Sequence, residues 1–429
     1  MSGTAEPEPL AGAAYLRLIL IGGVIGVPAA LVAAGFLVVV HQLENVLWDD
    51  LPDGLGYSSP PWFLVIALPV VGAALVVCAR RLLPGDGGHD PLGGVSVDPT
   101  PVSWGPGVAL AALGTLSFGA VLGPEAPLIA LGSVVGMAVT HLVHVGPRES
   151  RVLATAGSFS AISALFGGPL PAGVLLMEAG LGLGAALIPV LLPGLVAAAC
   201  GYLIFTGLGN WGGLEATTLK VPGLPTYDST SVEDLAVAVA VGIAAGLIIV
   251  LVHRGAGALA VLRDRGIGMA ALLLAGGLAV GCLAELAEVL GGDSHDVLFS
   301  GQAAVPTIVA ESSAGVVVVI LLAKATAYGI CLGCGFRGGP VFPAIFIGVA
   351  LASIGVVALD TSPTLAVAVG TAAGMAATTR LLISSLVVAA LLVGTGSVDA
   401  VPAAVLASAG AWLTVNALGT PPVPTTART

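Results

Sequence analysis

Apolar residues occur along the chain in long runs that end at glycine and proline. Several of these runs are shorter than the about 20 residues that a helix needs to cross a bilayer at right angles. Because Gly and Pro interrupt the others, the pattern predicts an all-α, polytopic membrane protein of tilted and broken helices. The runs begin near Leu16, Trp62, Val108, Ile129, Ala154, Ala185, Leu235, Met269, Val316, Ala344, Leu365, Leu382 and Val401.

Charged residues are scarce, which agrees with insertion into a lipid bilayer. The chain has 429 residues, of which 57% are hydrophobic and 9% are charged, whereas soluble domains carry about 25% charged residues. The net charge of -11 comes mostly from acidic residues scattered through loops. Nothing in the sequence resembles a nucleic-acid-binding surface, so we expect no nucleic-acid partner.

The first apolar run predicts a retained helix with a cytoplasmic N-terminus. It covers residues 16–40 and follows acidic residues, where a cleaved signal peptide would have a basic segment. Arg17 lies at the start of this run, and Arg80 and Arg81 close the next one. Because basic residues favour the cytoplasmic side, both ends are predicted there. A second basic loop, residues 253–265, is predicted on the same side.

Glu125 is the strongest candidate for a functional residue. It lies in the motif Gly123-Pro124-Glu125-Ala126-Pro127, between two long uncharged stretches. A carboxylate at membrane depth costs at least about 2.5 kcal/mol, so such residues usually face a cavity, a partner or a transported ion. Gly and Pro beside it are typical of a helix start. We therefore expect Glu125 at the N-terminal end of a membrane helix.

The order of motifs around Glu125 recurs in the second half of the chain. The Gly-x-x-x-Pro motif that ends at Pro127 recurs with Pro343 as its last residue, and Gly157 has a counterpart at Gly370. The two pairs are separated by nearly the same length of chain, which composition alone seldom produces. The alternative is that any Gly-rich membrane protein yields such pairs.

The recurrence predicts how the chain is organised. We predict one transmembrane domain over the whole chain, residues 1–429, built from two inverted-topology repeats of about residues 14–210 and 230–418. Repeats of this kind commonly meet near the bilayer midplane, where broken helices direct their N-termini at a bound anion. The two matching motifs are therefore expected to lie close together in the folded protein.

Two broken helices with Gly- and Pro-rich starts suggest an anion site. The first turn of a helix has N–H groups without internal partners, and the helix dipole adds about half a positive charge there. Such an end binds an anion without a full countercharge, so the ion can also leave. The second helix start that fits this description is the motif Arg337-Gly338-Gly339-Pro340-Val341-Phe342-Pro343. The alternative is that Gly and Pro only break two membrane helices.

These motifs resemble those of the CLC family of chloride channels and chloride/proton exchangers, over roughly residues 14–420. The family's Gly-Arg-Glu-Gly-Pro motif matches the segment around Glu125, and its Gly-x-Phe-x-Pro motif matches the segment that begins at Gly339. Lys324 and the run that follows it resemble the approach to that second motif. The resemblance implies a homodimer that transports small inorganic anions, most of all chloride, with Glu125 as the gate. Fluoride is the alternative anion.

Other positions depart from the family pattern. Where the family has Gly-Ser-Gly-Ile-Pro, this chain has Gly87-Gly88-His89-Asp90-Pro91, so no serine hydroxyl is available to the anion. His89 and Asp90 either face the substrate or form a polar loop. In the second motif Pro340 has no N–H, which leaves the next two amides. The resemblance implies anion contacts from Gly88, His89, Gly123, Pro124, Ala126, Gly339, Val341 and Phe342.

Proton coupling depends on a second acidic residue. The segment 165–170 resembles the family's Asn-Ala-Pro-Leu segment and leads to Glu178, which meets the first residue of the exchangers' Glu-Glu pair; Ala179 takes the second place. Glu178 is either an inner proton site or a charge at a helix end. The stretch 418–424 leads to no pore tyrosine, and a last helix and a regulatory domain are not expected. A proton-coupled exchanger and a passive anion channel therefore both remain open.

The remaining candidate chemistry favours structural roles. Cys331 and Cys334 have redox spacing, but their apolar setting favours helix packing. His141 and His144 beside charged residues favour a solvated loop over a metal site. An intramembrane enzyme is disfavoured, since no catalytic motif of the His-Glu-x-x-His or Gly-x-Ser-x-Gly kind is present. We expect no cofactor and no metal, and the Ala, Gly and Val bias suggests a bacterial plasma membrane.

Overall fold

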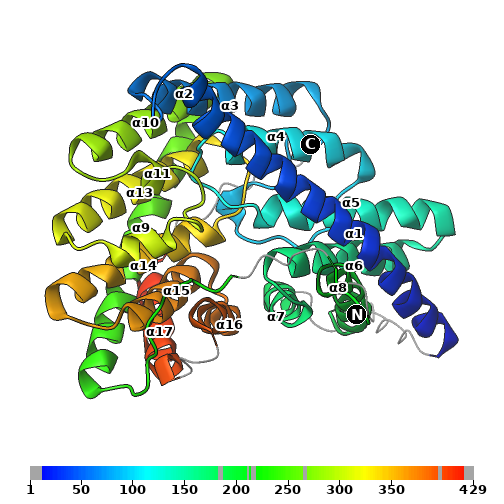
Figure 1. The fold of residues 1–429 in the computed structure, drawn as a ribbon. Coiled ribbons are helices and arrows are strands. Elements are labelled where there is room, and N and C mark those ends of the chain that lie inside the picture. Colours follow the sequence, from blue (N-terminus) through cyan, green and yellow to red (C-terminus); the bar gives the residue numbers. More distant parts are fainter. Residues whose placement is uncertain are drawn as a thin grey trace, which may run out of the picture. The chain divides into compact units, whose positions relative to one another are not determined.

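The structure is a computed structural model that describes residues 12–181, 187–209, 212–213, 219–263, 268–394 and 399–419. Within these ranges the chain folds into helices joined by short segments (Figure 1). The helices are α1 (Ala13–Asn45), α2 (Leu51–Gly54), α3 (Trp62–Leu82), α4 (Gly105–Leu116), α5 (Glu125–Val143), α6 (Pro147–Leu165), α7 (Pro169–Ala179), α8 (Ile188–Thr206), α9 (Val232–Leu262), α10 (Met269–Val289), α11 (Ser294–Val297), α12 (Val305–Ala310), α13 (Ala314–Cys334), α14 (Val341–Leu359), α15 (Pro363–Thr379), α16 (Leu382–Val393) and α17 (Val401–Leu418). A π-helical turn (η1, Val46–Asp50) and two 3₁₀ turns (η2, Pro91–Gly93; η3, Val102–Trp104) complete the set.

The all-α membrane architecture predicted from the apolar runs is confirmed. Four predicted starts, Trp62, Met269, Leu382 and Val401, are the first residues of α3, α10, α16 and α17. Other helices that match a predicted run begin before it, from two residues earlier in α13 (Ala314 against Val316) to seven in α6 (Pro147 against Ala154). In most of them the first turn is polar or contains Gly or Pro and so does not belong to the apolar run. The predicted start at Ala185 lies outside the described residues, and α8 is described from Ile188.

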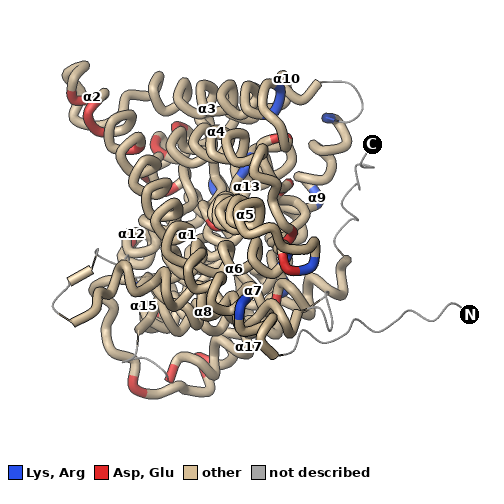
Figure 2. Tube along the Cα trace, turned by 90° about the vertical axis from the view of Figure 1, so that its right-hand side faces the viewer, with Lys and Arg blue, Asp and Glu red and all other residues tan. Residues whose placement is uncertain are grey.

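Nine helices in the described part of the chain are long and apolar enough to cross a membrane. Figure 2 shows that the bodies of the long helices carry few charges, and that Lys, Arg, Asp and Glu gather at helix ends and in the connecting segments. Three shorter apolar segments, Val102–Leu116, Pro169–Ala179 and Leu382–Val393, do not reach spanning length. The predicted mixture of full-length and broken membrane helices is therefore present.

The chain divides into two compact units. Unit 1 comprises Met1–Ala34, Val97–Val102 and Ile129–Thr217, and it contains α6, α7 and α8. Unit 2 comprises Gly35–Ser96, Ser103–Leu128 and Thr218–Thr429. In unit 2 the helices α9, α13, α14, α15 and α17 pack against one another, as their yellow, orange, red and green ribbons show in Figure 1.

Small residues set the helix spacing inside each unit. In unit 1, Gly132 of α5 lies against the backbone of Gly157 in α6, with no room for a side chain on either residue. In unit 2, Gly348 of α14 lies in the same way against Gly370 of α15. Close backbone approach at small residues is a common way to pack helices in lipid.

This pair of glycine contacts supports the predicted repeat. Gly132 and Gly348 are as far apart along the chain as the two Gly-x-x-x-Pro motifs, and Gly157 and Gly370 are the glycines that the sequence motifs already pair. α5 and α14 also have equal lengths of 19 residues. The repeat remains a prediction, and these contacts give it a physical basis beyond the motifs.

Candidate functional site

The two Gly- and Pro-rich breaks lie side by side in unit 2. Gly123 N donates to Gly339 O at 2.7 Å, and Gly339 N donates to Gly123 O at 2.6 Å. This antiparallel pair joins the segment before α5 to the segment before α14. Since free N–H groups and the positive end of the dipole lie at a helix N-terminus, the pairing brings two favourable anion-binding ends together.

Glu125 is the first residue of α5 and is 1% exposed. Its Oε1 accepts a hydrogen bond of 2.5 Å from Val341 N, the first amide of α14. Its Oε2 is buried and has no hydrogen-bond partner in the described part of the chain. The amide of Phe342 also interacts with this carboxyl group. The side chain of Glu125 thus lies where an anion would bind to the N-terminus of α14.

While this carboxyl group is in its observed position, only glycine fits on either side of it. A Cβ built at Gly339 would overlap the carboxyl carbon and Oε1 of Glu125, and a Cβ at Gly123 would overlap Oε2. Of the other predicted contacts, Pro124 is buried and its carbonyl accepts from Leu128 N at 3.0 Å. The two motifs therefore form one close-packed frame around the carboxylate.

Ala126, Pro340 and Phe342 complete the surroundings of the site. Phe342 is 2% exposed in the first turn of α14, and Ala126, next to Glu125, is half-buried. Pro340 is the residue before α14 and has no N–H. The Val341 amide is consequently the first donor that this helix offers, in agreement with its contact to Glu125.

Tyr328 is a polar group that sequence reasoning does not single out. It lies on α13, is fully buried, and donates from Oη to Pro340 O at 3.0 Å. It also interacts electrostatically with Glu125. A tyrosine in an apolar run usually seeks a hydrogen-bond partner, and this is the only signal that the sequence offers. Its hydroxyl fixes the carbonyl that immediately precedes the Val341 amide.

Lys324 stabilises the region beside α14. Its buried Nζ donates to the carbonyls of Asp296 at 2.9 Å and of Leu298 at 2.8 Å, at the C-terminal end of α11. The same Nζ lies 4.5 Å from the centre of the Phe346 ring on α14. A cation at a helix C-terminus is favourable because carbonyls and the negative end of the dipole lie there.

The predicted serine-free segment Gly87–Pro91 forms a tight turn after α3. Gly87 and Gly88 have φ of 72° and 102°, a region that glycine adopts without strain. Gly88 N donates to Gly85 O at 2.9 Å, so this amide is already used within the turn. Asp90 caps the short η2 turn through Leu92 N, at 3.1 Å from Oδ1.

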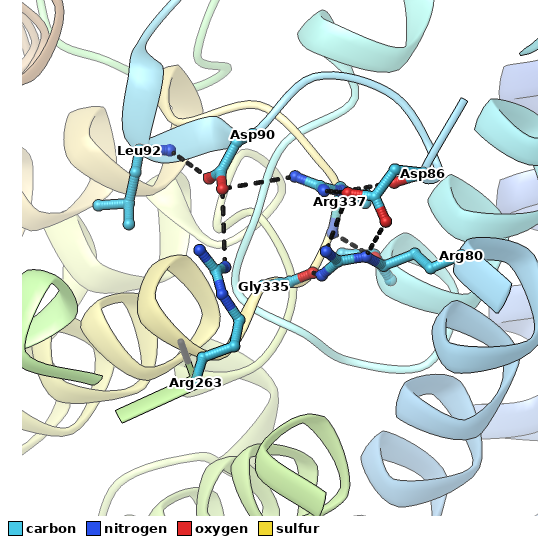
Figure 3. A network of polar contacts seen from close by, with 8 residues as sticks. Arg80, Asp86, Asp90, Leu92, Arg263, Gly335 and Arg337 are labelled. Atoms are coloured by element: carbon cyan, nitrogen blue, oxygen red, sulfur yellow. Dashed lines mark hydrogen bonds and ion pairs between the residues drawn. The ribbon is translucent and has the colours of Figure 1, made fainter. Parts of the chain in front are cut away.

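Five charged side chains of unit 2 meet at this turn (Figure 3). The Asp86 carboxylate accepts from Arg80 Nε at 2.8 Å and Nη2 at 2.9 Å, and it also accepts from Arg337 Nη2. Burial alone would raise the pKa of Asp86, but these bonds and the charges of both arginines outweigh it and hold the pKa below 3.8. Burial, followed by the charge of Arg80, lowers the pKa of Arg337 to about 10, so Arg337 stays protonated at neutral pH.

Arg337 connects this turn to the central site. Its backbone N donates to Thr115 Oγ1 at 3.3 Å, and its Nε donates to Asp86 O at 3.0 Å. It precedes Gly339 by two residues, so the segment that pairs with Gly123 is also fixed to the turn after α3. Arg80 adds a second link through Nη1, which donates to Gly335 O at 2.8 Å.

Comparison with known proteins identifies the family. A sequence profile described as the voltage gated chloride channel matches residues 89–416. The chain belongs to the voltage-gated chloride channel family. It is also 30% identical over 338 residues to YfeO of Escherichia coli, which carries the provisional name of an ion-transport protein; the match covers 76% of each chain. Family membership places the protein among membrane anion-transport proteins and not among enzymes.

Solved structures of this channel and transporter family share the fold. A slow cyanobacterial chloride/proton antiporter superposes with a TM-score of 0.76 at 17% identity, covering 95% of this chain and 96% of its own. A CLC-type fluoride/proton antiporter superposes with a TM-score of 0.72 at 18% identity, covering 96% and 98%. At these identities the likeness concerns the fold, and the predicted CLC-like architecture is confirmed.

Two further expectations drawn from the chloride-channel family concern residues away from the paired Gly123 and Gly339 segments. Glu178 is half-buried and lies one residue before the end of α7, in unit 1. Its role as an inner proton site stays a prediction. The stretch 418–424, which aligns with the family's approach to a pore tyrosine, lies outside the described residues from position 420 onward.

The cysteines of this family member occupy the packing surroundings predicted for them, whereas only one of the two histidines, His144, lies beyond the helix, because His141 is in the last turn of α5. Cys331 and Cys334 are free and buried, Val121 N donates to Cys331 Sγ at 3.2 Å, and Gly276 of α10 lies against Cys334. His141 and His144 are exposed at the C-terminal end of α5. Within the described ranges no three His, Cys, Asp or Glu residues are grouped to hold a metal ion.

Proposed function

We propose that this protein carries small inorganic anions, chloride first among them, across a bacterial plasma membrane, and that Glu125 gates the path. One observation supports the proposal most directly. The buried Glu125 carboxylate accepts a hydrogen bond from the first amide of α14, with 2.5 Å between Val341 N and Oε1, as a bound anion would. Membership of the voltage-gated chloride channel family supports the substrate class.

The gate works by competition for the helix end. As a carboxylate, Glu125 holds the Val341 amide and closes the outer part of the path. When the side chain takes up a proton or is displaced by an arriving anion, it moves away from Val341 N. The amide can then donate its hydrogen bond to the transported anion. The Gly123–Gly339 pair keeps the frame in place while the side chain moves, because two backbone hydrogen bonds hold it independently of Glu125.

We favour coupling to proton antiport, with a passive anion channel as the alternative. Glu125 supplies one proton-carrying group at the site. Glu178 is the second candidate, and the chloride/proton and fluoride/proton antiporters with the same fold support exchange by analogy. Ala179, which stands where exchangers have a second glutamate, favours the channel. Fluoride remains the alternative substrate, since backbone amides bind any small anion and position 88 has no hydroxyl.

Proteoliposomes separate these possibilities. At zero membrane potential an outward proton gradient is imposed, and chloride uptake is measured with a chloride electrode. An exchanger accumulates chloride against its gradient, whereas a channel only equilibrates it. Glu125→Gln is expected to raise chloride flux at alkaline pH and to remove its pH dependence. If the variant keeps the pH profile of the parent, Glu125 is not the gate.

Glu233→Gln is the matched control for this experiment. Glu233 also lies in the first turn of a helix, α9, and is exposed. The substitution removes a glutamate carboxylate from an equivalent position in a helix, and it does not change the paired Gly123 and Gly339 segments. Parental pH dependence is therefore expected, and an altered profile here would show that the assay responds to charge alone.

We also propose that the protein is a homodimer, with α8 as the first surface to test. Ile188, Leu192 and Leu195 are large apolar residues exposed along this helix. Engineered cysteines on this face are expected to crosslink two copies in membranes. The absence of a crosslink at every position on the face would count against a dimer formed through α8.

A further inference from the structure

Among the residues that the structure describes, the charged cluster around Asp90 carries more positive than negative charge, and its arginines are mostly buried. Arg80, Arg263 and Arg337 carry three positive charges, and Asp86 and Asp90 carry two negative ones. The side chains of Arg337 and Arg263 are 5% and 11% exposed, whereas those of Asp90 and Asp86 are 34% and 55% exposed. Buried guanidinium groups need close anionic partners, because leaving water is costly for a charge.

The two aspartates satisfy these arginines unequally. Asp86 makes hydrogen bonds to both Arg80 and Arg337. Asp90 uses Oδ1 for the cap of η2. Its Oδ2 lies 3.7 Å from Arg337 Nη1 and 3.6 Å from Arg263 Nη1, and both distances exceed those of N–H···O hydrogen bonds. Figure 3 shows the two guanidinium groups directed at this carboxylate, that of Arg263 from directly after the end of α9 and that of Arg337 from the segment before α14.

Arg337 Nη1 gives an independent indication of a ligand. This nitrogen is buried and donates no hydrogen bond within the described ranges of the chain. A buried charged donor without an acceptor is costly, and native structures rarely keep one unless a water, an ion or a function accounts for it. The arrangement therefore offers the charged donor Arg337 Nη1, a second positive group beside it and a carboxylate that contacts Arg337 Nη1 only at ion-pair distance.

We propose that Arg337 and Arg263 form a binding site for a small monovalent anion, and that Asp90 Oδ2 occupies this site when the anion is absent. The ligand class is a halide or a planar anion of similar size, such as nitrate, which guanidinium donors bind through charged hydrogen bonds. The anion enters as Asp90 Oδ2 turns away, while Oδ1 keeps its bond to Leu92 N. The site is built from side chains and is separate from the amide site that holds Glu125.

The location gives this site a role in transport. Arg80 lies in the last turn of α3 and Arg263 in the basic segment 253–265, and both regions are predicted to face the cytoplasm, so the site would lie at the inner end of the path. An anion that replaces Asp90 is then held two residues from the Gly339 segment. This role rests on the proposed function, but the binding site itself does not, since an anion can bind whether or not it is transported.

Asp90→Asn is the decisive variant. The asparagine side-chain oxygen can still cap η2, because Asn and Asp serve equally well at this position, while the competing negative charge is gone. Chloride binding to the purified protein is measured by isothermal titration calorimetry in gluconate buffer at pH 7. Coupling between close charge pairs suggests at least about tenfold tighter chloride binding than in the parent. Unchanged chloride affinity would overturn the proposal.

Two companion variants make the result specific. Asp360→Asn removes one charge from an exposed residue at the far end of α14, in a left-handed conformation that Asn also adopts, and is expected to bind chloride like the parent. In a double variant, Arg263→Gln is expected to abolish the gain in chloride affinity that Asp90→Asn produces alone. If the double variant binds as tightly as Asp90→Asn alone, the arginine pair is not the site.

Glu125→Gln separates this inference from the proposed function. Combined with Asp90→Asn, it is expected to leave the gain in affinity intact, since the two carboxylates occupy different sites. Tighter chloride binding without any chloride flux in liposomes would support the site and contradict the proposed function. If Glu125 gates chloride flux but Asp90→Asn does not change chloride binding, the proposed function is supported and the arginine site is contradicted.

Discussion

The glycine at position 339 offers a direct way to force the gate open. Gly339→Ala adds a methyl group that would overlap the carboxyl carbon and Oε1 of Glu125, because these atoms lie inside normal contact distance of the added Cβ. The backbone hydrogen bonds between Gly339 and Gly123 need no side chain and can persist. The carboxyl group is the movable partner, so we expect it to leave the Val341 amide.

The size of the effect follows from the bond that is lost. A hydrogen bond to a charged group contributes about 1.5–3 kcal/mol, and Glu125 makes one to Val341 N. Loss of that amount shifts the balance between the closed and open gate by roughly 10- to 100-fold. Chloride flux at alkaline pH, where the parent is mostly closed, should rise accordingly until the open state dominates.

Chloride efflux from proteoliposomes at two pH values measures this shift. Gly315→Ala is the control, since a methyl group there meets no atom closer than Ser313 Oγ at 3.7 Å. In a Glu125→Gln background the increase caused by Gly339→Ala should vanish, because no carboxylate remains to be displaced. Equal alkaline flux in Gly339→Ala and the parent, with both proteins folded, would refute the proposed contact between position 339 and the gate.

Three further predictions concern the supports of the site. Tyr328→Phe leaves the Pro340 carbonyl without its donor and should lower the free energy of unfolding by about 1–3 kcal/mol, measured by thermal unfolding in detergent; an unchanged melting temperature would contradict this. Lys324→Met removes a charged donor from the carbonyls of Asp296 and Leu298 and should cost more, at least about 3 kcal/mol, in the same assay. Because the pKa of Asp86 is held below its ordinary value of 3.8, its contribution to stability is complete above pH 3.8 and is lost as the pH falls through the folded-state pKa. Asp86→Asn should therefore flatten the acid limb of the stability profile, and an unaltered limb would exclude Asp86 as its source.

The architecture could be predicted from the sequence because hydropathy is a local property. Apolar runs locate helices wherever a helix lies in lipid or in the core, and starts such as Trp62 and Met269 follow directly. Errors arise where a helix extends beyond its apolar run. Helix α6 begins at Pro147 with a charged first turn, well before the predicted Ala154. Proline at the first helical position and an acidic residue in the first turn both favour a helix start without any apolar residue.

The site could be predicted only in part, because its contacts join distant segments. The sequence indicates Glu125 and the Gly339 motif through their unusual residues, and the predicted repeat of the two motifs favours their meeting. It gives no comparable signal for Tyr328, whose partner lies 12 residues away in a different structural segment. From the sequence Arg80 indicates only membrane topology, because its bonds to Asp86 and Gly335 depend on how the turn after α3 folds.

The central claim is that the Glu125 carboxylate occupies an anion site at the start of α14. The most direct test is a crystal structure of Glu125→Gln grown in bromide, with the anion located by its anomalous scattering. We expect a bromide ion within hydrogen-bonding distance of Val341 N, at the position that Oε1 takes in the parent. A fully occupied bromide site elsewhere in the protein, with the Val341 amide left without an anion, would contradict the account.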